Sequence, residues 1–228
     1  EIVTSTAARG GTVLIPSFAV GRAQLILFYL NALKAEKRIP DLPVFLDSPM
    51  AIDASEMFCR HHRYQRLAAD QCRDTCGVAR YTRSVDDSKA LVENPVPKVI
   101  ISASGMATGG RVLHHLKHYA PDHRNAILFV GYQAGGTRGA TIVAGADSVK
   151  IHGQQIPIKA QVASLNMLSA HADSGEIMAW LKNFKSPPRK TFITHGEAAA
   201  SDALRRQIEG ELGWQCEVPE YREEVILE

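Results

Sequence analysis

The stretch that decides the fold is VIISASGMATGGRVLHHLKHY, residues 99–119. It begins with a short apolar run, passes through a glycine-rich turn at residues 104–110, and continues with the apolar spacing of an amphipathic helix. A strand, a tight turn and a helix in this order are typical of a β-α-β unit. The stretch therefore predicts a parallel sheet with helices packed on its faces.

The same alternation extends in both directions from this stretch. We expect further strands at residues 12–15, 43–46 and 126–130, and helices at residues 20–34 and 52–66. Residues 149–162 differ, because two apolar strands flank a polar turn and predict a β-hairpin. Beyond it we expect helices at 174–184 and 198–212, and strands at 190–194, 216–218 and 224–227. The fold class is thus α/β, a mainly parallel sheet flanked by helices, with a soft domain boundary near residue 160.

Composition narrows the class of protein. The chain has 228 residues, of which 45% are hydrophobic, and a formal net charge of +2, so it can bury a sizeable core. No apolar run is long enough to span a bilayer and no signal peptide is present, so we expect no membrane partner. The four cysteines do not have the spacing of a disulfide framework, so we expect reduced thiols in a cytoplasmic protein. Because the chain begins with Glu1, we expect a piece of a longer polypeptide.

Polar and glycine-rich loops follow the expected strands. In a parallel sheet such loops gather at the carboxyl edge, where these sheets bind ligands. Two of the loops lead directly into helices. The free backbone N–H groups at the start of a helix can bind a phosphate group. Arg111 could add positive charge there. The alternative is that the glycines only permit tight turns. The candidate phosphate-binding residues are Ser17, Arg22, Ser104, Gly105, Thr108, Gly109 and Gly110.

Two histidines lie at the ends of elements in the last third of the chain. His171 precedes a helix start at which Asp173 and Glu176 have capping-box spacing. An imidazole in that turn can donate or accept a proton near neutral pH. His195 ends a strand beside Gly196, where a ring nitrogen can face a metal. Taken singly, a histidine in such a position is more often structural or solvated than catalytic or metal-binding.

Six motifs occur together in a fixed order: GGTVLIPSFAVGRAQ (10–24), DSPMA (47–51), SGMATGG (104–110), FVGYQA (129–134), SAHAD (169–173) and THGE (194–197). This series resembles the β-CASP family of metallo-β-lactamase-fold RNA-processing nucleases, which includes the cleavage-and-polyadenylation endonuclease and ribonuclease J. The last two motifs resemble the family's motifs B and C. The resemblance covers nearly the whole chain.

The resemblance implies an architecture and an activity. Residues 1–160 would form the β-CASP domain, and residues 161–228 the C-terminal part of the metallo-β-lactamase domain. In the family two zinc ions lie between the domains, where RNA enters. The chain would then be the RNA-cleft half of a zinc-dependent phosphodiesterase that acts on RNA as an endo- or exoribonuclease. By matching position, His195 would be a zinc ligand, and His171 would assist protonation of the leaving oxygen or stabilise the scissile phosphate.

The family's His-x-His-x-Asp-His ligand run is absent from this sequence. One histidine is too few to hold zinc tightly, so we expect this chain alone to be metal-free and inactive. Its expected partners are RNA and a missing N-terminal metallo-β-lactamase half. The apolar face that this half would cover predicts self-association, for example as a homodimer. Two alternatives stay open: a non-catalytic module that binds RNA or protein, and a small-molecule enzyme that binds a nucleotide.

Overall fold

The structure is a computed structural model that describes residues 1–166, 168–169 and 171–226. Contacts within the chain divide it into two compact units, Glu1–Ser169 and Ala170–Glu228. The assignment of residues 1–160 and 161–228 to two family domains stays a prediction. No helix in the described ranges is both long enough and apolar enough to cross a membrane.

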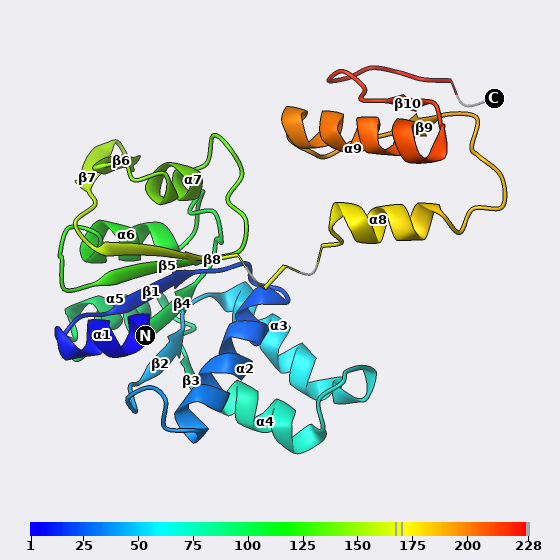
Figure 1. Cartoon of the computed structure of the whole chain (residues 1–228). Coiled ribbons are helices and arrows are strands. Elements are labelled where there is room, and N and C mark those ends of the chain that lie inside the picture. Colours follow the sequence, from blue (N-terminus) through cyan, green and yellow to red (C-terminus); the bar gives the residue numbers. More distant parts are fainter. Residues whose placement is uncertain (167, 170, 227–228) are drawn as a thin grey trace. The chain divides into compact units, whose positions relative to one another are not determined.

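The first unit is built on a six-stranded sheet (Figure 1). Every neighbouring pair of its strands is parallel, which confirms the predicted α/β class. The spatial order is β3-β2-β4-β1-β5-β8. The strands are β1 (Val13–Pro16), β2 (Val44–Leu46), β3 (Ala79–Tyr81), β4 (Val99–Ser102), β5 (Ala126–Val130) and β8 (Gln161–Leu165).

Helices cover both faces of this sheet, because successive strand residues point to opposite sides and most are apolar. On one face Ile15 and Ile101 pack with α2 and α3; on the other, Leu14, Ile100 and Phe129 pack with α6 and α7. The helices are α1 (Ile2–Ala8), α2 (Arg22–Ala35), α3 (Pro49–Arg60), α4 (Ala69–Gly77), α5 (Val85–Glu93), α6 (Val112–Tyr119) and α7 (Arg138–Val143), with a 3-10 turn at His62–Tyr64.

The predicted hairpin is present as the antiparallel pair β6 (Ser148–Ile151) and β7 (Gln154–Pro157). The expectation that its second strand continues to residue 162 is wrong. The backbone N–H groups of Lys159 and Ala160 both donate to Ala120 O, at 2.8 and 2.9 Å, and this turns the chain away from the hairpin. Residues 161–165 then enter the main sheet beside β5.

Other boundaries also differ from the expectation. The helix expected at 52–66 begins earlier, at Pro49, where the Ser48 hydroxyl accepts a hydrogen bond from Ala51 N–H as an N-cap, and it ends at Arg60. Residues 69–93 contain α4, β3 and α5, which the apolar pattern does not reveal because each buries only one or two side chains or none.

A disulfide joins Cys59 in α3 to Cys76 in α4. The expectation of reduced thiols is therefore wrong for this pair, whereas Cys72 and Cys216 are free. The two cysteines are 17 residues apart along the chain, and this spacing alone does not show that α3 and α4 pack against each other. In the structure these helices do pack together, and this brings the two sulfur atoms within bonding distance. The cytoplasmic assignment loses the support that it drew from the thiols and stays a prediction.

The second unit contains α8 (Ser174–Leu181), β9 (Thr191–Phe192), α9 (Ala198–Leu212) and β10 (Cys216–Glu217), with the two short strands parallel. Its small core includes Met178, Ile208 and Trp214. Trp180 is 63% exposed, and Ile226 is 88% exposed, so apolar side chains do reach the surface of this unit. Residues 224–226 are not a strand, and residue 227 of the expected last strand lies outside the described residues.

Candidate functional site

Three loops meet at the carboxyl edge of the sheet, where β1, β4 and β5 end. Gly105 lies so close to the first loop that a Cβ atom on it would be 2.9 Å from Phe18 N. The Gln133 Nε2 atom, in the loop after β5, donates to Gly105 O at 3.2 Å. Gly139 N–H donates to Met106 O at 3.0 Å. The parallel topology therefore brings the segments of three of the six sequence motifs into contact.

The glycine-rich loop after β4 has its own internal bonds. The hydroxyl oxygens of Ser104 and Thr108 lie 3.0 Å apart, and Thr108 N–H donates to the Ser104 hydroxyl at 3.3 Å. Gly110 has a φ of +78°, and a Cβ there would lie 2.7 Å from Ala103 O. Gly109 has open space at the same position. The turn thus requires glycine at residue 110 but not at residue 109.

Arg22 is the first residue of α2 and lies at this edge. Its Nη1 atom donates to Leu168 O, and its Nη2 atom would be 3.4 Å from a Cβ placed on Gly131. No carboxylate in the described part of the chain forms an ion pair with it. Ser17 is only 1% exposed, and its hydroxyl donates to Phe18 O at 3.1 Å. The phosphate-binding roles of these residues stay predictions.

The buried carboxylate of Asp47, in the loop after β2, forms hydrogen bonds that hold this loop and the end of the glycine-rich loop in place. Asp47 follows β2 and accepts three hydrogen bonds, from Arg111 Nη1 at 2.6 Å, from His115 Nε2 at 2.6 Å and from Ser88 Oγ at 2.5 Å. Burial by itself raises the pKa of Asp47, but these hydrogen bonds outweigh it and hold the pKa below its ordinary value.

Arg111 is committed to this network. Besides Asp47, its guanidinium donates to Thr82 O at 2.9 Å and Arg83 O at 2.7 Å. The expectation that it offers free charge to a phosphate is wrong, because its charge is already balanced by a buried carboxylate. Instead it fixes the end of the glycine-rich loop, since it directly follows Gly110.

His115 is a site-supporting residue that the sequence reasoning missed. Its side chain is 1% exposed. The signal was present in the sequence, because residue 115 falls on the same helical stripe as the buried Val112, Leu116 and Tyr119. A histidine on an apolar stripe needs a polar partner, and Asp47 supplies it.

The two motif histidines lie in the second unit and are exposed. His171 precedes α8, whose predicted capping box is confirmed: Glu176 N–H donates to Asp173 Oδ1 at 2.8 Å, and Asp173 N–H donates to Glu176 Oε2 at 3.0 Å. His195 lies between β9 and α9 with a φ of +65°. A Cβ on the next residue, Gly196, would be 2.4 Å from Ser201 Oγ, so a larger residue there would require the Ser201 hydroxyl to move.

The described residues do not form a complete donor set for a metal. Among the residues that the structure describes, no three histidine, cysteine, aspartate or glutamate side chains gather in a group that could hold a metal ion. A structural or catalytic zinc ion takes at least three protein ligands. The residues present therefore do not fit a zinc centre on their own, and His195 can supply one ligand at most.

Comparison with known families settles which family this is. A model of the Beta-Casp domain matches residues 23–142, the part of the chain that holds most of the sheet and its loops. The chain belongs to the Beta-Casp family. A second model, the Zn-dependent metallo-hydrolase RNA specificity domain, matches residues 155–219. The resemblance seen in the six motifs is confirmed.

Similar proteins agree with this assignment. Ribonuclease TTHA0252 of Thermus thermophilus is 41% identical over 91% of this chain and 48% of its own length. The transcription termination factor FttA of Methanocaldococcus jannaschii is 33% identical over 90% of this chain and 35% of its own length. An RNase J-like protein of the same organism is 32% identical over 86% of this chain and 46% of its own length. The chain thus spans half or less of the length of these relatives.

Proposed function

We propose that this chain binds the phosphodiester backbone of single-stranded RNA along the carboxyl edge of its parallel sheet, as part of a zinc-dependent ribonuclease. The observation that supports the proposal most is the contact between the loops after β1, β4 and β5, with Arg22 beside them and no carboxylate of the described residues paired with it. A cationic side chain and polar loop groups at one edge of the sheet can bind the negatively charged phosphodiester backbone of RNA. The RNA specificity domain matched at residues 155–219 points to the same substrate class.

In this proposal His171 and His195 take part in RNA cleavage. His195 would contribute one imidazole ligand to a zinc centre completed by further ligands, and zinc held there would supply Lewis acidity and a hydroxide nucleophile. His171 donates a proton to the leaving oxygen or stabilises the scissile phosphate. We propose that the chain by itself is inactive and needs ligands from additional sequence, which is supported by the lack of a three-ligand group among the described residues. The same incompleteness is the observation that favours the second candidate, a non-catalytic RNA-binding module.

A binding experiment tests the RNA part of the proposal. The 228-residue chain is titrated with a single-stranded oligoribonucleotide at several salt concentrations, and the same is done for Arg22→Gln and Arg124→Gln. Arg124 is the control, because it precedes β5 at the opposite edge of the sheet and its charge is already paired with Asp122. We expect Arg22→Gln to weaken binding about three- to tenfold and to reduce the slope of log K against log salt by about 0.7, the share of one phosphate. Equal affinity of the two variants would contradict the proposal.

A further inference from the structure

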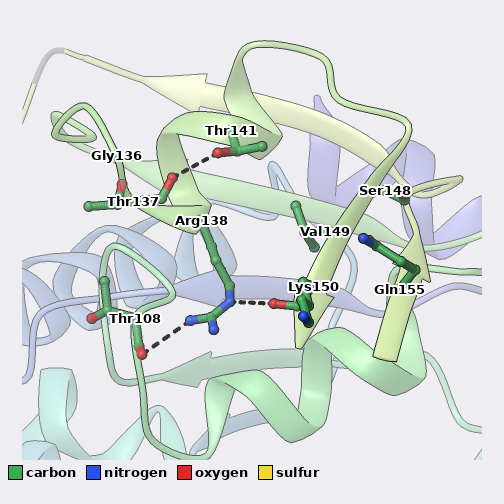
Figure 2. A pocket seen from close by; sticks show the side chains of 9 residues that line it. All are labelled: Thr108, Gly136, Thr137, Arg138, Thr141, Ser148, Val149, Lys150 and Gln155. Atoms are coloured by element: carbon green, nitrogen blue, oxygen red, sulfur yellow. Dashed lines mark hydrogen bonds between the residues drawn. The ribbon is translucent and has the colours of Figure 1, made fainter. Parts of the chain in front are cut away.

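A polar pocket of about 440 Å³ opens on the first unit (Figure 2). Three segments line it: Thr108 of the glycine-rich loop, residues 136–141 around the start of α7, and the hairpin β6–β7. Thr108 is the only lining residue that also belongs to the candidate phosphate-binding set at the sheet edge. The pocket is therefore a separate feature that adjoins that edge through one loop.

Two cationic side chains line the pocket, Arg138 and Lys150. The Arg138 Nε atom donates to Lys150 O at 2.7 Å, and its Nη1 atom lies 3.3 Å from the carbonyl oxygens of Ala107 and Thr108 (Figure 2). These bonds fix the guanidinium between the loop and the hairpin. Its Nη2 atom and the Lys150 ammonium have no hydrogen-bond acceptor in the described part of the chain. The Arg138 guanidinium is thus held in place with one nitrogen unused, and the Lys150 ammonium beside it is exposed.

The rest of the lining fits an anion. Thr108, Ser148 and Gln155 add hydroxyl and amide groups, whereas the Thr141 hydroxyl already donates to Thr137 O at 3.0 Å. No aspartate or glutamate is among the lining residues. Neither cation forms an ion pair with a described carboxylate, so the positive charge is not neutralised within the protein. A fixed guanidinium with a second cation and hydroxyl donors beside it has the chemistry that binds phosphate esters.

We infer that this pocket binds a phosphate group of a nucleotide, with Arg138 and Lys150 as the charged donors. Two sources offer this chemistry: an internal phosphate of an RNA strand, which rests on the proposed function, and the phosphate of a free mononucleotide, which does not. The volume is within the range of small-molecule sites, about 300–1,000 Å³, and therefore admits either. In the first case the pocket extends the path of the strand beyond the carboxyl edge.

The test uses Lys150→Gln and its matched control Lys159→Gln in the whole chain. Both lysines are exposed, and Lys159 does not line the pocket, so the pair removes the same charge inside and outside it. Arg138→Lys is a second variant that keeps the charge but loses the planar guanidinium. Equilibrium binding is measured with three probes: inorganic phosphate, adenosine monophosphate, and a single-stranded RNA with a 5′-hydroxyl end. Thermal unfolding of each variant checks that the fold is kept.

We expect Lys150→Gln to weaken binding about three- to tenfold relative to Lys159→Gln, with the salt slope for RNA reduced by about 0.7. Weakening for RNA alone identifies the strand as the source, and weakening for phosphate and the mononucleotide identifies a free nucleotide. If no probe binds the wild-type chain, or if both lysine variants bind all three probes equally, the inference is overturned. The Arg22→Gln result separates this failure from that of the proposed function, because Arg22 does not line the pocket.

Discussion

Asp47 shows how one buried side chain can organise the loops around a site. It is 0% exposed and holds Arg111 from the glycine-rich loop, His115 from α6 and Ser88 from α5. Its backbone oxygen also accepts the Ser102 hydroxyl at 2.9 Å, which joins it to the end of β4. Removing one member of such a network leaves the others buried without a partner.

Replacing Asp47 by asparagine should therefore destabilise the first unit strongly. We expect a loss of about 3–5 kcal/mol, because a buried charged pair loses one partner while the other stays buried. Asp53→Asn is the control, since Asp53 is exposed in its pair with Arg83, and such surface pairs contribute about 0–1 kcal/mol. Urea denaturation followed by far-UV circular dichroism measures both, and equal losses would contradict the assigned role of Asp47.

The same carboxylate predicts a pH dependence. Its pKa in the folded chain is below the ordinary value of 3.8. The stabilisation is therefore fully present above the ordinary pKa and is lost as the pH falls through the lower, folded pKa. We expect the wild type to lose stability more steeply than Asp47→Asn as the pH falls below the ordinary value of 3.8, in urea titrations at each pH. Parallel curves would show that Asp47 does not carry this dependence.

Gly109 and Gly110, neighbours in the loop after β4, should respond differently to substitution by alanine. Gly110→Ala should lower the stability by at least about 1–2 kcal/mol, because the positive φ strains any residue with a Cβ. The close approach to Ala103 O adds to that cost. Gly109→Ala, which meets open space, should be nearly neutral. Thermal melting temperatures compare the two, and a melting temperature for Gly110→Ala at or above that of Gly109→Ala would argue against the described turn.

At the scale of elements, α8 depends on its N-terminal cap. Asp173→Ala removes the acceptor for Glu176 N–H and should cost about 0.5–2 kcal/mol, whereas Asp173→Asn keeps an acceptor and should stay near wild type. Both tryptophans of the chain, Trp180 and Trp214, lie in the second unit, so their fluorescence follows its unfolding in urea selectively. An alanine variant as stable as the asparagine variant would show that the cap does not support the helix.

The disulfide between α3 and α4 gives a second prediction about elements. Only Cys72 and Cys216 are free, so a thiol reagent added to the denatured, unreduced chain should count two thiols. After reduction and removal of the reductant the count should rise to four, the total in the sequence. Four thiols before reduction would restore the expectation drawn from the cysteine spacing. Cys59→Ser, which leaves three cysteines, serves as the control for the reagent.

Over the whole molecule, the sequence patterns predict some features of the fold and miss others. The buried strands β1, β4 and β5 are continuous apolar runs, and the glycine-rich loop stands out by composition, so the sheet and its loop edge were predictable. The contacts of Asp47 were not, because His115 is 68 residues away along the chain. The polar segment at residues 69–93 was missed because its short elements bury little apolar surface.

We propose that this chain supplies the RNA-binding edge and one zinc ligand of a ribonuclease whose other ligands lie in further sequence. The most direct measurement combines zinc analysis with RNA cleavage. It compares the 228-residue chain, the same chain extended at its N-terminus by sequence that carries a His-x-His-x-Asp-His run, and the extended chain with His195→Ala. We predict bound zinc and cleavage only in the extended chain, with both reduced by the substitution. Equal cleavage with and without the extension, or full activity after His195→Ala, would contradict this proposal.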